Sequence, residues 1–436
     1  MKEFDTDMSA VISSFAAPKA ERNCFCGEIN KEMTPECLIR LTEALAGTLS
    51  PGAKIVLSLS DKTEYLMIKF AVLSALIASG VEAYNIIDAG DRSVAKFILR
   101  HFAFDAGIHI QVEGNNISFE VLNRDGCPAG ENMMNDITES LKSGKTHRPA
   151  TEQFLPPVNA SKIPLYYFKD LVAKTCCRRL KFTGVICTTS SETQTIMKKI
   201  GSAFGLSLLF INDEKLLPEF ITENHADFGL LIGSNGKTGL YDEHGRVLSG
   251  DTYYNLVTLI VLSANASSTV FMPTHATGTT EEIAEICGGK IVRVPEQELE
   301  QKLAEVETAT AELQYDLCFD PIRGMIRICE FLYLNQCRLS YVCSLLPIMY
   351  KISRYIDCPE EKKSDVMHKI LSSIGTGETI DLTEGIKIVD GRGWVLIIPN
   401  GKDNKINIVS ESHDAEIANE IAGDIYNSIS SFLQGE

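Results

Sequence analysis

Short apolar runs rich in β-branched residues alternate with helical patterns along most of this chain, and this alternation restricts the fold more than any other feature. The first block has strand patterns at 53–59 and 81–87 around an apolar helix at 65–79, and a further helix follows at 91–102. Strands and helices of these lengths in alternation predict right-handed βαβ units and a largely parallel or mixed sheet. The chain is therefore predicted to be an α/β protein.

The strand–helix cycle restarts twice more, which suggests a repeated domain. The last part of the chain differs in kind, because a hairpin followed by a long helix is typical of an α+β unit. The remaining predicted elements are 107–112 and 117–123 in the first block, 166–174, 180–188, 192–204 and 207–211 in the second, 268–273, 280–287 and 290–294 in the third, and 386–389, 394–399, 405–410 and 414–432 in the last.

At 436 residues the chain is too long for one ordinary hydrophobic core, so several domains are expected. The first twenty or so residues have no sustained pattern, and a polar, proline-containing stretch at 142–157 is the first likely linker. The predicted division is a mobile leader at 1–22, domain I at 23–155, domain II at 156–262, domain III at 263–375 and domain IV at 376–436.

The composition excludes several classes of protein. A net charge of −17 argues against a nucleic-acid or anionic-membrane surface, since such partners are usually met by a basic face. The apolar run at 65–79 is too short to span a bilayer. Thirteen cysteines share no repeated ligand spacing, so free core thiols are favoured over a metal site even at Cys24 with Cys26 and Cys176 with Cys177. A cytoplasmic protein without a cofactor is expected.

One segment, residues 226–251, carries a specific family resemblance. Its flanks are similar to the metal-loop segment of the α-D-phosphohexomutases, the group of phosphomannomutases, phosphoglucomutases and phosphoglucosamine mutases. Three further segments, 30–36, 97–107 and 393–405, resemble that family in the same order along the chain. The residues that carry the metal-loop likeness are Ala226, Asp227, Gly229, Gly239, Asp242, Glu243, Gly245, Arg246, Leu248, Ser249, Gly250 and Asp251.

This resemblance implies three similar α/β domains with mixed sheets plus a smaller C-terminal α+β domain, arranged around a central cleft. It also implies a chemistry, because family members move a phosphoryl group between positions of a hexose phosphate through a phosphoserine. Such a transfer needs an in-line nucleophile, a divalent cation and groups that hold the substrate phosphate. Four loops supply these parts in the family.

The serine loop of the family reads roughly T-A-S-H-N-P. In this chain the matching position holds Glu113, followed by Gly114. A carboxylate cannot be the phosphoserine carrier, although Glu113 could imitate its charge; drift in a loop is the alternative reading. Ser118 is the nearest hydroxyl, but it falls in the following predicted strand and makes a weak substitute nucleophile.

The metal loop of the family reads D-G-D-x-D-R, because Mg²⁺ prefers hard anionic oxygens. Here the equivalent residues include Gly233, Ser234, Asn235 and Lys237, and none of residues 233–238 is a carboxylate. A Mg²⁺ site, expected for the family, is therefore predicted to be absent. The run 236–238 also resembles the end of a P-loop, but the first glycine of that motif is missing, so nucleotide hydrolysis is not favoured.

The last two loops also depart from the family pattern. The interval 306–321, where a sugar loop of the form G-E-x-S-G-H belongs, has no glycine-rich segment and reads as shortened. The phosphate loop has lost its arginine and with it a bidentate anion clamp. Its remaining candidates for phosphate binding are Asn400, Gly401, Lys402 and Lys405, and a plain polar hairpin turn is the favoured alternative.

The sequence thus predicts a catalytically degenerate phosphohexomutase that acts as a binding or regulatory partner in sugar-phosphate or nucleotide-sugar metabolism. The alternative is an active hexose-phosphate mutase of the phosphomannomutase or phosphoglucomutase type with substituted catalytic residues. A sugar phosphate is the expected small partner. A nucleotidyltransferase or an intact mutase is the expected protein partner, and no nucleic-acid or membrane partner is expected.

Overall fold

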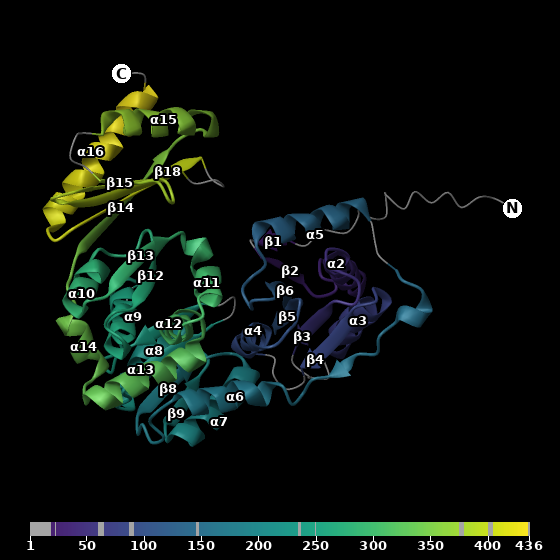
Figure 1. Cartoon of the computed structure of the whole chain (residues 1–436). Coiled ribbons are helices and arrows are strands. Elements are labelled where there is room, and N and C mark those ends of the chain that lie inside the picture. Colours follow the sequence, from purple (N-terminus) through teal and green to yellow (C-terminus); the bar gives the residue numbers. More distant parts are fainter. Residues whose placement is uncertain are drawn as a thin grey trace. The chain divides into compact units, whose positions relative to one another are not determined.

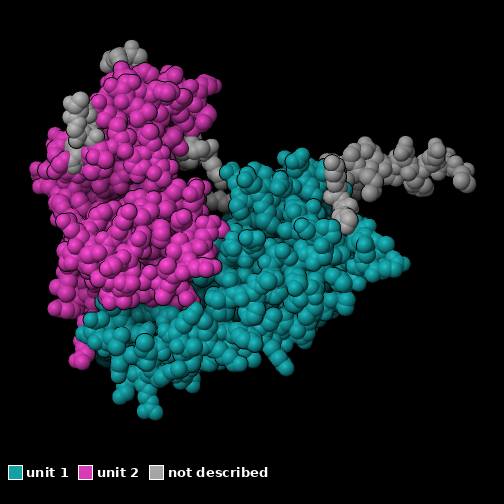
Figure 2. All heavy atoms as spheres, viewed as in Figure 1, with its two compact units in different colours: residues 1–247, 319–335 teal, residues 248–318, 336–436 magenta. Residues whose placement is uncertain are grey.

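The structure is a computed structural model that describes residues 19–21, 23–59, 65–86, 91–144, 148–233, 237–248, 250–374, 379–399 and 404–434. The chain forms two compact units, each continuous in space but not in sequence (Figure 2). Unit 1 contains Met1–Val247 and Phe319–Asn335, and unit 2 contains Leu248–Cys318 and Gln336–Glu436.

A seven-stranded sheet organises the first part of unit 1, in the order β1-β2-β6-β5-β3-β4-β7 (Figure 1). The central strand β3 runs parallel to β4 and β5, whereas β5 and β6 form an antiparallel hairpin. The predicted leader lies mostly outside the described residues, but its end, β1, pairs with β2. The strands are β1 Lys19–Glu21, β2 Cys24–Glu28, β3 Lys54–Ser58, β4 Glu82–Ile86, β5 Ala106–Glu113, β6 Asn116–Asn123 and β7 Val158–Asn159.

Helices cover the two faces of this sheet unequally. On one face α2 (Pro35–Gly47), α3 (Leu66–Ala78) and α5 (Glu131–Ser143) enclose an apolar core. The start of α2 is set by Thr34, whose hydroxyl accepts a hydrogen bond from the Cys37 amide as an N-cap should. On the other face the amphipathic helix α4 (Arg92–His101) packs against β3 and β5.

A second, four-stranded sheet completes unit 1 in the order β11-β10-β8-β9. Its strands β9 and β10 run parallel to β8, while β11 returns antiparallel to β10. One apolar core runs from the α4 face of the first sheet to this sheet and to α13, which joins unit 1 from far along the sequence. The elements are α6 Pro164–Lys174, β8 Thr183–Cys187, α7 Ser191–Phe204, β9 Ser207–Ile211, α8 Leu217–Glu223, β10 Phe228–Ile232, β11 Thr238–Tyr241 and α13 Pro321–Asn335, with short 3₁₀ turns at Thr151–Gln153 and Glu214–Leu216.

Unit 2 begins with helices around a parallel pair of strands, β12 and β13. This pair is much smaller than the two sheets of unit 1, although the predicted strand–helix–strand block itself is confirmed. The elements are α9 Gly250–Ala264, β12 Thr269–Pro273, α10 Thr279–Cys287, β13 Lys290–Val294, α11 Glu296–Glu305, α12 Ala309–Phe319 and α14 Leu339–Leu345.

The last sheet of unit 2 has five antiparallel strands in the order β14-β18-β17-β16-β15, and α16 packs against it beside α15 (Figure 1). Its edge strand β14 lies before residue 376, where the sequence predicted the fourth domain to begin; the domain division stays a prediction, but this sheet draws on earlier residues. The elements are β14 Tyr350–Asp357, α15 Glu360–Ser373, β15 Thr379–Asp381, β16 Ile386–Asp390, β17 Gly393–Pro399, β18 Lys405–Ser412 and α16 Ala415–Gln434.

No helix in the described part of the chain is both long enough and apolar enough to cross a bilayer.

A tight turn after β11 offers a test of the fold. Asp242 accepts hydrogen bonds from the Arg246 amide and guanidinium, and Gly245 between them has φ +73°. A Cβ on Gly245 would lie 2.5 Å from the Pro218 carbonyl oxygen, whereas a Cβ on Gly52, with φ +76°, would meet nothing within 4 Å. Both Gly→Ala changes incur the left-handed cost of about 1–2 kcal/mol, and Gly245→Ala adds about 1–3 kcal/mol of overpacking. We expect Gly245→Ala to lower the thermal midpoint clearly more than Gly52→Ala; equal shifts would contradict this packing.

Candidate functional site

The position that the resemblance assigns to the phosphoserine is a two-residue hairpin turn. Strands β5 and β6 stay paired up to Glu113 and Asn116, so only Gly114 and Asn115 remain to connect them. Gly114 has φ +58°, as a tight hairpin of this kind requires. Glu113 is the last residue of β5 and is exposed. A closed two-residue turn therefore lies at the position that the resemblance assigns to the nucleophile loop.

Glu113 makes a hydrogen bond to the second domain of unit 1. The hydroxyl of Thr189, which follows β8, donates to its carboxylate at 3.1 Å. Ser118, the substitute nucleophile considered from sequence, lies within β6 as predicted. Its hydroxyl is half-buried and donates to the Cys24 sulfur at 3.4 Å. Ser118 is therefore a side chain of the sheet and lies two residues beyond the turn.

The sheet face beneath this turn is polar over three rows of paired residues, which we call the polar face. Side chains alternate between the faces of a strand, so residues paired across β3, β5, β6 and β2 point the same way. Burial increases from the turn toward the centre of the sheet. The rows are Glu113, Asn116 and Glu28 near the turn, then Gln111, Ser118 and Cys26, then Ser58, His109, Glu120 and Cys24.

The buried end of the polar face holds a charge that is paired. Glu120 accepts two hydrogen bonds from the Arg92 guanidinium, at 2.6 and 2.7 Å, and a third from the Asn23 amide at 3.1 Å. Burial alone would raise the pKa of Glu120, but the Arg92 charge beside it outweighs burial and holds that pKa below its ordinary value. Glu120 therefore remains an anion inside the sheet.

His109 sits beside this ion pair and is also buried. Its Nδ1 lies 3.2 Å from the Ser58 hydroxyl oxygen. Burial lowers the pKa of His109, so its imidazole is neutral at neutral pH. The side chains from Ser58 to Glu120 can therefore act as hydrogen-bond donors and acceptors, but they are buried within the fold.

The metal-loop position is only partly described, since Ser234 and Asn235 lie outside the described residues. Gly233 and Lys237 close the base of that loop, with the Gly233 amide donating to the Lys237 carbonyl at 2.8 Å. The Lys237 ammonium lies 2.6 and 2.8 Å from the two carboxylate oxygens of Glu214. Both side chains are exposed, so this ion pair adds little stability.

The donor set around that loop does not suit Mg²⁺. The Lys237 ammonium already forms an ion pair with Glu214, the carboxylate that the structure pairs with this loop. Within the ranges that the structure describes, no three His, Cys, Asp or Glu side chains gather closely enough to hold a metal ion. The described part of the site therefore does not fit the ion that the family resemblance implies.

The two remaining family loops fall in unit 2. Asn400, Gly401 and Lys402 lie outside the described residues, and Lys405 is exposed at the start of β18. The interval predicted to be a shortened sugar loop is the helix α12 instead. Its Gln314 side chain accepts a hydrogen bond from the Phe271 amide at 3.0 Å and donates to the Phe271 carbonyl. This carboxamide thus completes the open side of β12.

Sequence reasoning missed a polar cluster around residues 274–278, after β12. Lys387 donates to the Thr274 carbonyl at 2.9 Å and lies 4.2 Å from the Trp394 ring centre. Burial, followed by the nearby Arg293 charge, lowers the pKa of Lys387 to about 8. Buried Glu411 accepts from the Gly278 amide at 2.9 Å. These residues are far apart in sequence, so no spacing signal could have found them.

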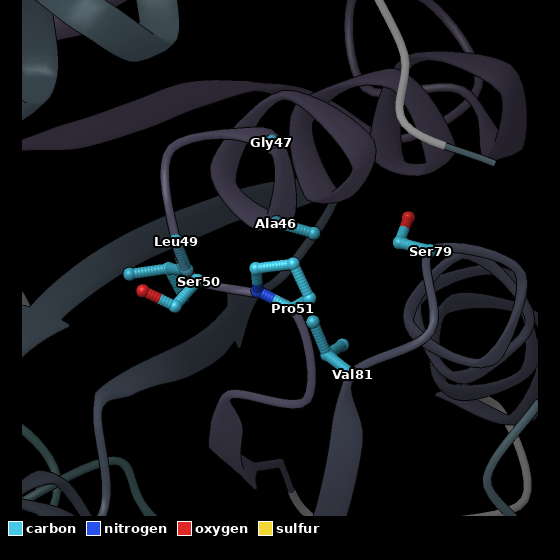
Figure 3. A pocket seen from close by; sticks show the side chains of 7 residues that line it. All are labelled: Ala46, Gly47, Leu49, Ser50, Pro51, Ser79 and Val81. Atoms are coloured by element: carbon cyan, nitrogen blue, oxygen red, sulfur yellow. The ribbon is translucent and has the colours of Figure 1, made fainter. Parts of the chain in front are cut away.

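A small hollow in unit 1, of about 160 Å³, lies away from this site (Figure 3). It is lined by the end of α2 and by residues just before β3 and β4, including Gly47, Pro51 and Val81. It therefore lies at the amino ends of these parallel strands. Ligands of open α/β sheets bind at the carboxyl ends, where the polar face lies.

Comparisons with known proteins agree with this architecture. The family model "Phosphoglucomutase/phosphomannomutase, alpha/beta/alpha domain I" matches residues 25–148. A protein named "Probable phosphoglucosamine mutase" from Pyrococcus horikoshii is 21% identical over 93% of this chain and 96% of its own length. A phosphopentomutase from Thermococcus kodakarensis is 22% identical, over 94% of this chain and 97% of its own.

A solved structure shows the same fold. A phosphoglucomutase/phosphomannomutase family protein from Burkholderia thailandensis superposes with a TM-score of 0.79, covering 95% of this chain and 97% of that one at 13% sequence identity. The first-domain match, the nearly full-length relatives and this superposition agree with one another. Together they show a chain whose first domain matches this family model and whose fold and sequence are similar to those of α-D-phosphohexomutases along nearly its whole length.

The buried histidine of the polar face gives a pH prediction. A base whose pKa is lowered by folding stabilises the native state fully above its unfolded pKa of about 6.5, and this stability falls as pH decreases. His109→Asn should therefore reduce the loss of urea-unfolding free energy between about pH 7.5 and pH 5.5, by at most about 1.4 kcal/mol per pH unit. Burial also lowers the pKa values of His101 and His275, so these two residues still make the unfolding free energy of the variant depend on pH.

The matched control for this measurement is His225→Asn. His225 is exposed and has φ +49°, a backbone conformation that asparagine tolerates. We expect this control to keep the pH dependence of the unaltered chain. An unchanged pH dependence in His109→Asn would show that His109 is not held neutral by burial.

Proposed function

We propose that this phosphohexomutase-family protein of sugar-phosphate metabolism does not transfer phosphoryl groups through a phosphoserine, and that it acts as a binding or regulatory partner. The observation that carries the proposal is the two-residue turn at Gly114 and Asn115. It leaves Glu113, hydrogen bonded to Thr189, at the position where the family's nucleophile belongs.

The electrostatics of the metal-loop position support the same proposal. Phosphoryl transfer depends on a divalent cation that neutralises charge on the moving group. Lys237 and Glu214 neutralise each other there, and no carboxylate lies between residues 233 and 238. A nucleophile alone would therefore not restore the transfer.

The ligand class follows from the relatives and from the last domain. One relative is named for phosphoglucosamine and another for a phosphopentose, so a sugar phosphate is the class they share. Lys402 and Lys405 would hold its phosphate as point charges. A nucleotidyltransferase or an intact mutase is the protein partner that this role implies, because each handles the same sugar phosphates.

The first test measures turnover. We expect no conversion of glucose-1-phosphate or mannose-1-phosphate by the pure protein with Mg²⁺ in a coupled assay. Glu113→Ser should also be inactive, because the added hydroxyl meets no metal ion. Glu113→Gln serves as the matched variant that changes charge without adding a nucleophile. Turnover by the unaltered chain would favour the alternative of an active mutase with substituted residues.

The second test measures binding by thermal shift. A sugar phosphate at ten times its dissociation constant should stabilise the fold by about 1.4 kcal/mol, with or without Mg²⁺. The double variant Lys402→Ala with Lys405→Ala should lose this shift. Lys290→Ala, which removes an exposed lysine of β13, should keep it. No shift at millimolar ligand, or a shift that requires Mg²⁺, would contradict binding through these two lysines.

A further inference from the structure

Two cysteine thiols meet on the polar face of unit 1. Cys24 and Cys26 are two residues apart on β2, so the alternation of side chains sends both to the same face. Their sulfur atoms are 2.9 Å apart. Both residues are half-buried, so the pair is close to solvent and is not sealed in a core.

A hydroxyl on the neighbouring strand holds both sulfurs. Ser118 of β6 is paired with Cys26 in the sheet. Its hydroxyl donates to the Cys24 sulfur at 3.4 Å, and the Cys26 thiol donates to the Ser118 oxygen at 3.6 Å. The three side chains therefore form one contact set, and the two thiols have little freedom to turn apart.

The surroundings of Cys24 disfavour its thiolate. Burial, followed by the Cys26 thiol beside it, raises the pKa of Cys24 to about 12. The negative charge of Glu120 acts in the same direction. Cys24 therefore keeps its proton at neutral pH. Because only a thiolate attacks a disulfide, we assign the first attack to Cys26 and the second to Cys24.

From this geometry we propose that Cys24 and Cys26 are a redox-active pair, which closes to an intrastrand disulfide by exchange with a low-molecular-weight disulfide such as oxidised glutathione. The Cys26 thiolate attacks one sulfur of oxidised glutathione and releases one glutathione thiolate. That thiolate takes the proton of Cys24, whose sulfur then attacks the mixed disulfide on Cys26 and releases the second glutathione. Two protein thiols are oxidised, and one glutathione disulfide is reduced to two thiols.

The strand geometry determines how stable the closed form is. Two residues of an antiparallel strand span about 6.8 Å between Cα atoms. Disulfides usually span about 4.4–6.8 Å between Cα atoms. The strand span lies at the upper end of the disulfide range, so closure favours a local shortening of β2. The disulfide is thus expected to open readily with a thiol reductant, unlike a structural crosslink. This inference does not depend on whether the chain turns over a sugar phosphate.

The experiment uses the full chain. It is incubated with oxidised glutathione, quenched with an alkylating reagent, digested and analysed by mass spectrometry. We expect the peptide that contains Cys24 and Cys26 to lose two hydrogen atoms and to escape alkylation, and dithiothreitol to reverse both changes. Cys176 and Cys177 are an internal control, because they are adjacent in a loop and Cys176 is exposed. We expect them to be alkylated or glutathionylated.

Two single variants separate the steps. Cys24→Ser should stop at a glutathione adduct on Cys26, because the second sulfur is missing. Cys26→Ser should gain less adduct at Cys24 than Cys24→Ser gains at Cys26, since Cys24 keeps its proton. The unaltered chain carries the main test, so a folding defect in a variant would not obscure it. Full alkylation of both cysteines in that chain, or an adduct that never closes, would overturn the proposal.

Discussion

Continuous pairing of β5 with β6 is the constraint on which the candidate site depends. The two strands stay in register from Ala106 with Asn123 to Glu113 with Asn116, so the chain must reverse within two residues. The register also determines which side chains lie on the face opposite the apolar core, because a slip of one residue would exchange the two faces. Val112 and Ile110 pack against the apolar core, and Glu113, Gln111 and His109 are sent to the polar face.

The scaffold around this hairpin is held by interactions between residues outside the serine-loop and metal-loop positions. In unit 1 the Thr193 hydroxyl donates to Asp91 at 2.6 Å, and the Tyr167 hydroxyl donates to Asp320 at 2.9 Å. These bonds link α4 to α7 and α6 to the start of α13, over the same apolar core. These contacts lie outside the serine-loop and metal-loop positions, so they hold the architecture independently of the residues at those positions.

Local signals explain what the sequence could predict. The β-branched pattern of a strand acts over a few residues, so β3 and the hairpin of β17 and β18 were predicted to within about two residues, the usual uncertainty of such boundaries. The placing of Glu113 at the serine position of the family stays a prediction. Nothing local indicated that β14 pairs with β18, or that Gln314 completes β12, because such contacts join residues far apart in sequence. The alternation of polar residues in β5 and β6 was visible, but only strand pairing shows that they share a face with Cys24 and Cys26.

The polar composition of this face bears on its role. Buried ion pairs such as Glu120 with Arg92 are seldom more stabilising than apolar side chains of similar volume. An apolar surface under a further helix would serve the sheet at least as well, as the opposite face shows with α2, α3 and α5. Half-buried polar groups at the carboxyl end of β5 instead lie where open α/β sheets receive ligands. Their hydrogen-bonding capacity, together with the two adjacent thiols, suits recognition and control of a bound molecule better than stabilisation of the fold.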